Sequence, residues 1–157
     1  AYNRNFFMTR LETEVRRATR HDRPLSLLFI DVDHFKQVND RYGHLQGDFV
    51  LRELGALFLR SLRQTDYLCR YGGDEFIVVL PETSKETAST TAEKILRAVR
   101  EHHFRDLEEP DRAIPVTVSV GVGALKPGQT AEDLLQSSDE ALYRAKDEGR
   151  DQIAGSA

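Results

Sequence analysis

Residues 70–76 read RYGGDEF and place two adjacent glycines between two apolar runs, at 67–71 and 76–80. Aromatic and β-branched residues on both sides of a Gly-Gly pair are typical of a β-hairpin with a tight two-residue turn. We therefore predict two antiparallel strands joined at Gly72 and Gly73.

Two consecutive carboxylates, Asp74 and Glu75, follow this turn. Acidic residues are poor strand formers, and a charge beside a buried strand costs free energy unless something compensates it. A bound cation would compensate both carboxylates. Because side chains alternate along a strand, Asp74 and Glu75 should point to opposite faces, and we expect different roles for them. The alternative is that both are turn residues in contact with water.

A second acidic group follows residues 25–30, which are almost continuously apolar. Such a run is typical of a strand covered on both faces, and Asp31 and Asp33 come directly after it. If the hairpin lies beside this strand, the two acidic groups meet at one end of the sheet. Oxygen ligands without a Cys or His cluster favour Mg²⁺ or Mn²⁺ over zinc, and Mg²⁺ is often shared with substrate phosphates. We therefore expect a nucleotide substrate.

Apolar positions at helical spacing predict four amphipathic helices and one short helical segment. Thr83 with Glu86 resembles a capping box at the start of a helix, and Thr130 and Asp133 open the last helix. The expected elements are a first helix that ends near His21, a short one near 35–40, a helix over 46–60, a helix after Thr83, and a last helix that stops at Gly149.

Valines alternate with small residues over 116–123, which predicts a strand whose second face receives something large. The charged segment 105–115 before it should be an exposed loop, and a short strand is expected at 152–154. Helices separated by strands, with one hairpin, predict an α/β (α+β) fold with a central mixed sheet of about five strands.

The composition is that of one soluble domain over residues 1–157. A chain of this length can bury a single core, and 39% hydrophobic with 31% charged residues is ordinary for a globular protein. A net charge of −4 argues against general binding to a nucleic-acid polymer. The single cysteine, Cys69, excludes an internal disulfide and agrees with a reducing compartment, so we expect a cytoplasmic location.

The first residues lead directly into the first helix, so we expect this domain to have been cut from a longer protein. That protein could be anchored in a membrane, with this domain on the cytoplasmic side. An upstream sensory or regulatory domain is the partner that we expect within the same chain.

RYGGDEF resembles the signature of the GGDEF-domain diguanylate cyclases, and other segments resemble that family in the same order. These segments are 31–36, 39–40, 42–44, 47–48 and 143–150. The resemblance covers nearly the whole chain. It implies a nucleotidyl-cyclase or palm-like fold and the condensation of two GTP molecules into cyclic di-GMP, with release of pyrophosphate.

By this resemblance, Asp31, the backbone carbonyl of Val32 and Asp74 would hold Mg²⁺, or Mn²⁺ in its place. Such an ion neutralises phosphate charge and helps to activate a hydroxyl. The family pattern also implies that Asp74, with Glu75 beside it, takes or guides the proton of the 3′-hydroxyl.

The resemblance assigns Lys36, Lys146 and Arg150 to the triphosphate, where cations offset the charge of the leaving group. For Lys146 and Arg150 the alternative is solvated charge at a helix end. Asn39 and Asp48 match the positions that read guanine. A carboxylate accepts hydrogen bonds only, which suits the paired N–H donors of guanine.

The remaining matches concern substrate access and regulation. His44 matches a position near the substrate, and Gly72 and Gly73 would let the substrate approach the turn. Arg63 and Asp66 match an Arg-x-x-Asp pair that forms an inhibitory site for cyclic di-GMP in many members. A chance pair of surface residues is the alternative for Arg63 and Asp66.

A diguanylate cyclase that acts as a homodimer is our leading hypothesis, because one site holds only one of the two GTP molecules. The alternative is an inactive GGDEF-like module that senses GTP or cyclic di-GMP; the presence of both Asp74 and Glu75 favours catalysis. A relative that makes another nucleotide product is disfavoured by Asn39 and Asp48. Asp151 stands where the family often has asparagine.

Overall fold

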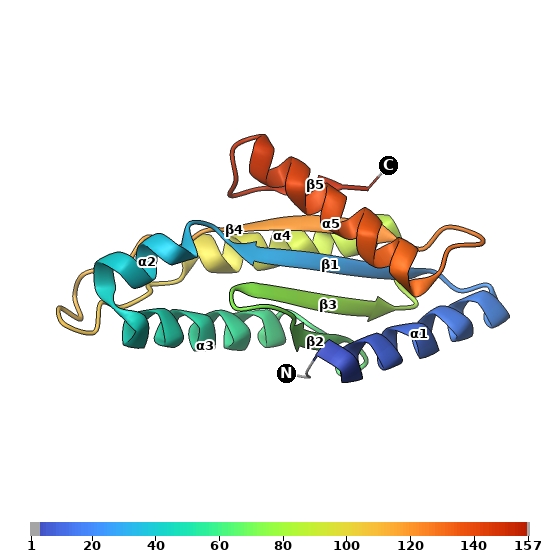
Figure 1. The fold of residues 1–157 in the computed structure, drawn as a ribbon, viewed down its shortest axis with the longest axis horizontal. Coiled ribbons are helices and arrows are strands. Elements are labelled where there is room, and N and C mark those ends of the chain that lie inside the picture. Colours follow the sequence, from blue (N-terminus) through green and yellow to red (C-terminus); the bar gives the residue numbers. More distant parts are fainter. Residues whose placement is uncertain (1–3, 157) are drawn as a thin grey trace.

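A five-stranded sheet forms the centre of the protein (Figure 1). The structure is a computed structural model, and it describes residues 4–156. The strands are β1 (Leu25–Val32), β2 (Tyr67–Arg70), β3 (Glu75–Pro81), β4 (Val118–Ala124) and β5 (Ile153–Gly155). Their order is β2-β3-β1-β4-β5, with β5 parallel to β4 and the other neighbours antiparallel. The predicted mixed sheet is confirmed.

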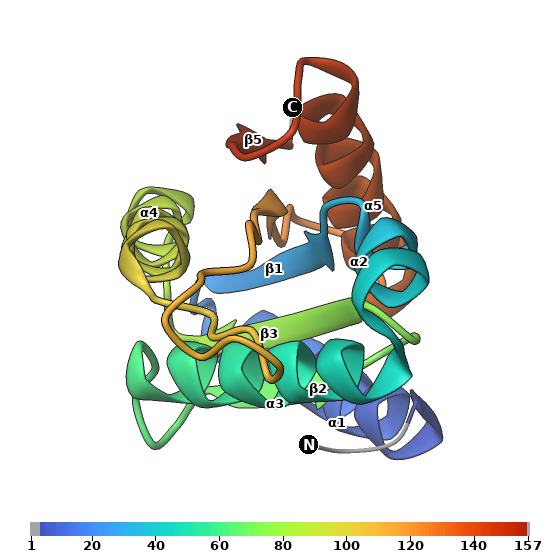
Figure 2. The same cartoon turned by 90° about the vertical axis from the view of Figure 1, so that its left-hand side faces the viewer.

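Five helices cover the sheet within the described residues. They are α1 (Arg4–His21), α2 (Phe35–Tyr42), α3 (His44–Arg60), α4 (Lys85–Glu101) and α5 (Ala131–Asp147). Leu28 and Ile30 of β1 share a core with α3 and α4, whereas Leu27 and Phe29 share the opposite core with α1 and α5. Figure 2 shows α4 and α5 on opposite sides of β1. The alternation of side chains along β1 therefore serves two cores at once.

The strand β1 is the buried strand that the apolar run predicts. All eight of its residues are buried, because β3 and β4 pair with its two edges while helices cover its two faces. The strand continues beyond the apolar run, so Asp31 and Val32 belong to it. A carboxylate that is only 6% exposed thus lies within the sheet itself.

The small residues of β4 allow α5 to pack against the sheet at backbone distance. A Cβ atom added at Gly121 would lie 2.3 Å from the backbone of Ser138 and Leu142. One added at Gly123 would lie 2.0 Å from the Ser138 hydroxyl. The prediction that something large covers this face is confirmed, and the helix itself is what covers it. Regular pairing begins at Val118, slightly later than predicted, although Val116 is still buried.

The last helix begins at the predicted residues, Thr130 and Asp133, which form a capping box. The Thr130 hydroxyl accepts a hydrogen bond from the Asp133 amide at 3.1 Å, and the Asp133 carboxylate accepts one from the Thr130 amide at 2.9 Å. The helix ends at Asp147, and Gly149 follows with a φ of 124°. Gly149 thus supplies the positive φ that ends the helix.

The capping box predicted for Thr83 and Glu86 is wrong. Ser84 is the N-cap residue, and its hydroxyl accepts a hydrogen bond from the Thr87 amide at 3.3 Å. Thr83 is buried, and its hydroxyl hydrogen-bonds to the Pro81 carbonyl at 2.9 Å. The Thr83 side chain therefore contacts the end of β3 and does not cap the helix, although the local pattern predicts that it would.

The loop over 105–115 is only partly exposed, which corrects the prediction. Residues 107–113 are exposed, but Phe104 and Ile114 on either side of them are buried in the core of α3 and α4. The Ile114 amide donates to the Phe104 carbonyl at 2.7 Å. Asp106 is also buried, and its carboxylate accepts from two following backbone amides. The loop is thus closed at its base like a short hairpin.

The other predicted elements are present with small shifts. Gly43, with a φ of 92°, separates α2 from α3, and α3 begins at His44 rather than at Gln46. The final strand lies one residue later than predicted. None of the helices within residues 4–156 has both the length and the apolar character needed to cross a membrane.

Candidate active site

The hairpin that carries RYGGDEF is wider than the predicted two-residue turn. Residues 71–74 connect β2 to β3, the Tyr71 amide donates to the Glu75 carbonyl at 2.8 Å, and neither glycine has a positive φ. The reason is a contact with the neighbouring strand, since the Asp74 carbonyl accepts a hydrogen bond from the Val32 amide at 3.1 Å. Asp74 therefore extends the pairing with β1 instead of closing the turn.

The two glycines have different roles in this turn. A Cβ atom at Gly72 would lie 2.4 Å from a carboxylate oxygen of Glu75, whereas one at Gly73 would meet nothing within 4 Å. Gly72 therefore leaves room for the Glu75 side chain, and Gly73 leaves the tip of the turn open. The Arg70 guanidinium donates to the Gly73 carbonyl at 2.7 Å and holds that tip to β2.

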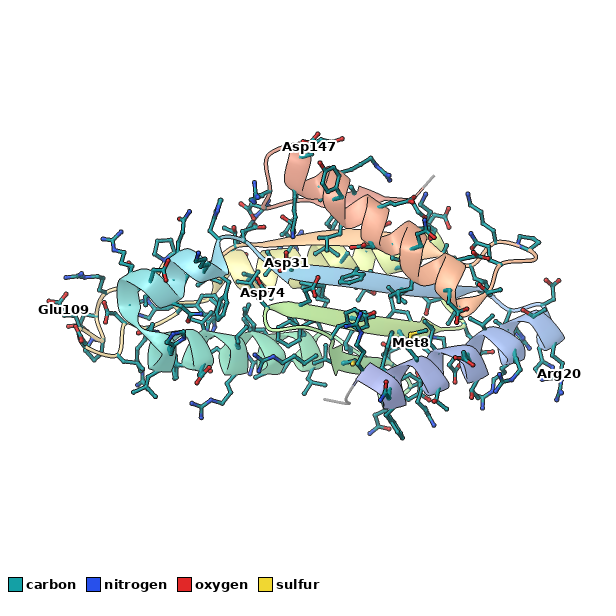
Figure 3. All side chains as sticks on the ribbon, in the orientation of Figure 1. Met8, Arg20, Asp31, Asp74, Glu109 and Asp147 are labelled. Atoms are coloured by element: carbon teal, nitrogen blue, oxygen red, sulfur yellow. The ribbon has the colours of Figure 1, made fainter. Side chains whose placement is uncertain are left out.

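Three carboxylates meet where β1 ends and β3 begins. The register pairs Asp31 with Glu75, so these two side chains share one face of the sheet. Figure 3 shows Asp31 and Asp74 beside one another at this end of the sheet. The predicted meeting of the two acidic groups is confirmed for Asp31. The division of roles between Asp74 and Glu75 stays a prediction.

The environment of Asp31 and of Glu75 opposes the ionisation of these two carboxyl groups. Burial raises the pKa of Asp31 to about 6; the hydrogen bond from Lys146 lowers it, and the charges of Asp74 and Glu75 raise it. The pKa of Glu75 is also raised, first by burial and then by the charge of Asp74. A cation at this position would therefore offset both the cost of burying the negative charges and the repulsion between them.

The residues at this corner fit a divalent cation that takes part of its shell from water and phosphate. Asp31 Oδ1 is buried and has no hydrogen-bond partner, while Asp31 Oδ2 is paired with the Lys146 ammonium. Residues 4–156 contain no cluster of three or more His, Cys, Asp or Glu side chains suited to a metal. A few hard oxygen ligands and a free carboxylate oxygen match Mg²⁺ or Mn²⁺ rather than a structural zinc site.

Asp33 does not belong to this group. Its carboxylate accepts hydrogen bonds from the hydroxyls of Thr117 and Ser119, both at 2.6 Å, and from the Asp151 amide at 3.0 Å. Asp33 therefore fastens β1 to β4 and to the segment before β5. Arg100 holds Asp151 in turn through its carboxylate and carbonyl. The only signal for this in the sequence is the pair of hydroxyl residues on the small face of β4.

The α2–α3 corner holds the residues assigned to guanine. Asn39 is half-buried, and its Oδ1 atom has no hydrogen-bond partner. Gly47 faces that atom closely, since an added Cβ would lie 1.8 Å from it. Asp48 and His44 are exposed on the first turns of α3. Asn39 Oδ1 is itself buried, whereas the exposed Asp48 carboxylate can receive the N–H donors of a base.

Lys146 and Arg150 lie at the end of α5 and line an open cavity of about 360 Å³ together with Tyr143 and Asp147. Lys146 is not simply solvated, because it is paired with Asp31. Arg150 is exposed. Lys36 is exposed on the first turn of α2, close in the chain to the end of β1. The structure therefore places these cations on segments that adjoin the carboxylates.

Arg63 and Asp66 lie at the opposite end of the hairpin from the turn. The Arg63 guanidinium is paired with the Asp66 carboxylate at 3.2 Å and also donates to the Thr83 hydroxyl at 2.6 Å. The Asp66 side chain is only 3% exposed, whereas that of Arg63 is 56% exposed. The Asp66 carboxylate also accepts from the Arg63 backbone amide at 2.8 Å, and the regulatory role of this pair stays a prediction. Arg63 also lines a cavity of about 360 Å³ with Arg17, His21 and Arg23.

Residues 1–152 match the family described as diguanylate cyclase, GGDEF domain. The chain belongs to the GGDEF family. This confirms the resemblance on which the assignments of individual residues are based.

Named relatives agree with this membership. Diguanylate cyclase DosC of Escherichia coli K12 is 41% identical over 151 residues, which cover 96% of this chain and 32% of that protein. Response regulator PleD of Caulobacter vibrioides is 40% identical over 157 residues, which cover 99% of this chain and 34% of that protein. This GGDEF chain thus spans about one third of the length of these relatives.

The fold of the GGDEF family is also found here. The GGDEF domain of DgcB from Caulobacter crescentus, solved in complex with c-di-GMP, matches with a TM-score of 0.93 and 30% identity, over 98% of this chain and 90% of that chain. The α/β, palm-like fold class predicted from the sequence is confirmed.

We expect the contribution of Asp31 to the stability of the metal-free GGDEF domain to fall as the pH rises from about 4 to about 7.5. Its pKa is raised from 3.8 to about 6 in the folded protein, so folding binds a proton over this range. Relative to the Asp31→Asn variant, the unsubstituted protein should lose about 2 kcal/mol of unfolding free energy over the range, as each pKa unit corresponds to about 1.4 kcal/mol.

Urea denaturation with EDTA at both pH values measures this difference. Asp111→Asn, in the exposed part of the 105–115 loop, is the matched control and should follow the unsubstituted protein. An unchanged stability difference between Asp31→Asn and the unsubstituted protein at the two pH values would contradict the account of Asp31.

Proposed function

We propose that this GGDEF domain is a diguanylate cyclase that converts two GTP molecules into one cyclic di-GMP and two pyrophosphates. One observation carries the proposal: Asp31 is buried with a free carboxylate oxygen, and Asp74 and Glu75 of an intact RYGGDEF turn lie beside it. A cluster of carboxylates of this kind suits phosphoryl transfer assisted by a metal ion.

Asp31, the Val32 carbonyl and Asp74 would hold the Mg²⁺ or Mn²⁺ ion, which supplies charge neutralisation at the phosphates and helps to activate the hydroxyl. In each half-reaction the 3′-oxygen of one GTP bonds to the α-phosphorus of the other, and the bond to the pyrophosphate leaving group breaks. Asp74 or Glu75 takes or guides the proton of the 3′-hydroxyl. The raised pKa of Glu75 brings a carboxylate closer to the range in which it can accept that proton.

The cations around this corner would bind the triphosphate. Lys146 and Arg150 share one open cavity, and Lys36 lies on α2 near the end of β1. Positive charge at these positions stabilises the pyrophosphate as it leaves.

The α2–α3 corner would select guanine. Asn39 Oδ1 is an unpaired acceptor, and the exposed Asp48 carboxylate adds further acceptors. Guanine presents two adjacent N–H donors on its edge, whereas adenine would leave these acceptors poorly matched. His44, exposed beside them, would contact the substrate from the start of α3.

Catalysis would require a homodimer, because each domain supplies one site for one GTP and the two nucleotides must react with each other. The relatives are about three times longer than this chain, so we propose that an upstream sensory or regulatory domain controls the pairing of two copies. The reaction belongs in the cytoplasm, where GTP is available. No nucleic-acid polymer is involved.

We further propose that Arg63 and Asp66 bind cyclic di-GMP and inhibit the enzyme. Arginine can pair with phosphate or with guanine edges, and aspartate accepts from guanine donors. The buried Asp66 carboxylate already holds the half-exposed Arg63 side chain in place, and the adjoining cavity adds Arg17 and Arg23.

Turnover should depend on Asp74. With the chain fused to a strong dimerisation domain, GTP and Mg²⁺ should yield cyclic di-GMP, and Asp74→Ala should reduce the rate at least about 100-fold by removing a metal ligand and a proton acceptor. Product analysis by chromatography measures the rate. Asp111→Ala, in the exposed loop, is the control that should keep full activity.

Two results would reject the cyclase assignment or the role of Asp74. GTP binding without any cyclic di-GMP formation in the dimeric fusion would identify an inactive GTP sensor. Retained turnover in Asp74→Ala would remove that residue from the chemistry.

Product inhibition should depend on Arg63. In the same fusion, Arg63→Ala should raise the cyclic di-GMP concentration needed for half-inhibition at least about tenfold, since a charge-assisted contact is worth roughly 1.5–3 kcal/mol. Arg60→Ala, at the exposed end of α3, is the matched control. Inhibition of Arg63→Ala at the original concentration would show that the pair is only structural.

A further inference from the structure

Lys146 occupies the position of a counter-ion to a buried carboxylate. Its ammonium group is paired with Asp31 Oδ2, and the Asp31 side chain is 9% exposed against 31% for Lys146. Water therefore has little access to the Asp31 charge, so the ammonium group carries most of its compensation. Lys146 lies in the last turn of α5, where its long side chain can reach either the sheet or the open cavity beside Tyr143 and Arg150.

Other cations near this corner are engaged elsewhere or exposed. Arg4 donates to the Tyr71 hydroxyl at 2.8 Å, and Arg70 donates to the Gly73 carbonyl. Arg150 and Lys36 are exposed. Among the residues that the structure describes, Lys146 is the one cation in ion-pair contact with Asp31.

The contact with Lys146 compensates the acidic corner incompletely. Lys146 is the cation paired with Asp31, Arg4 adds a weaker favourable charge at Glu75, and Asp31 Oδ1 remains buried without a hydrogen-bond partner. A single ammonium group cannot neutralise Asp31 and bind a triphosphate at the same time. The contact between Lys146 and Asp31 therefore suits the domain without nucleotide, and an ion of higher charge could replace Lys146 in it.

We propose that Lys146 is the resident counter-ion of Asp31 in the metal-free domain, and that a divalent cation displaces it and so releases it to bind phosphate. This inference rests on the metal site of the proposed function and assigns Lys146 a second role there. Because the cation must displace Lys146, the ion pair weakens metal binding in the absence of nucleotide. Release of Lys146 then makes metal binding and phosphate binding favour each other.

Removing the ion pair between Lys146 and Asp31 should lower the stability of the metal-free protein and should strengthen its metal binding. Removal of the Lys146 charge leaves the buried Asp31 carboxylate without a partner, so the metal-free protein should unfold at a lower urea concentration. The same change removes the competitor of the metal. Lys146→Met should therefore bind Mn²⁺ about tenfold more tightly than the unsubstituted protein, the factor that corresponds to one weak ion pair.

Calorimetric titration of nucleotide-free protein with Mn²⁺ tests this proposal, and urea denaturation with and without Mn²⁺ serves as a second readout. Arg150→Met removes a charge from the same cavity without touching Asp31 and should leave Mn²⁺ affinity within about twofold. Lys146→Arg keeps a cation and should behave like the unsubstituted protein. Lys146→Gln, which can still donate to Asp31, serves as the neutral variant if Lys146→Met does not fold.

Three outcomes would overturn the inference. The first is that the neutral Lys146 variants bind Mn²⁺ no more tightly than the unsubstituted protein. The second is that Arg150→Met gains as much Mn²⁺ affinity as Lys146→Met. The third is that Lys146→Met still binds Mn²⁺ tightly when Asp31→Asn is added. Because these titrations contain no GTP, they are independent of turnover. A protein that binds Mn²⁺ as expected but forms no cyclic di-GMP would support the inference while rejecting the proposed enzyme.

Discussion

The burial of Asp31 at the end of β1 is the constraint on which the rest of the site depends. A strand covered on both faces and paired on both edges carries a carboxylate that water hardly reaches. Lys146 from α5 forms an ion pair with this carboxylate, while the RYGGDEF turn adds two more carboxylates. The ionised form of such a group is costly without a cation, and Lys146 compensates its charge in part.

Long-range contacts bring the parts of this site together. The Asp74 carbonyl is bonded to the Val32 amide, which draws the turn onto the end of β1. Gly121 and Gly123 let α5 approach the sheet, so that Lys146 reaches Asp31. In contrast, Asp33 serves the framework by fastening β1 to β4. Two carboxylates of the same sequence motif thus have different partners: Asp31 is paired with Lys146 and keeps one oxygen free, whereas both oxygens of Asp33 accept hydrogen bonds within the framework.

Much of the fold follows from local pattern, because the buried run of β1, the small face of β4 and the Thr130 cap are set by nearby residues. The errors arise where distant residues compete. The contact of Asp74 with Val32 widens the predicted Gly-Gly turn, and the Arg63 guanidinium donates to the Thr83 hydroxyl. Phe104 and Ile114 join the core at the base of a charged loop. Sequence also located the acidic corner, but the ion pair between Asp31 and Lys146 spans most of the chain and has no local signal.

We propose that Asp31 and Asp74 share one divalent cation with a bound nucleotide. Anomalous diffraction from crystals grown with Mn²⁺ and a non-hydrolysable GTP analogue tests it most directly. We expect an anomalous peak in contact with both carboxylates and with the phosphates, and Lys146 moved from Asp31 to the triphosphate. A bound nucleotide with no peak at these two residues, or a peak held by other side chains, would contradict the account.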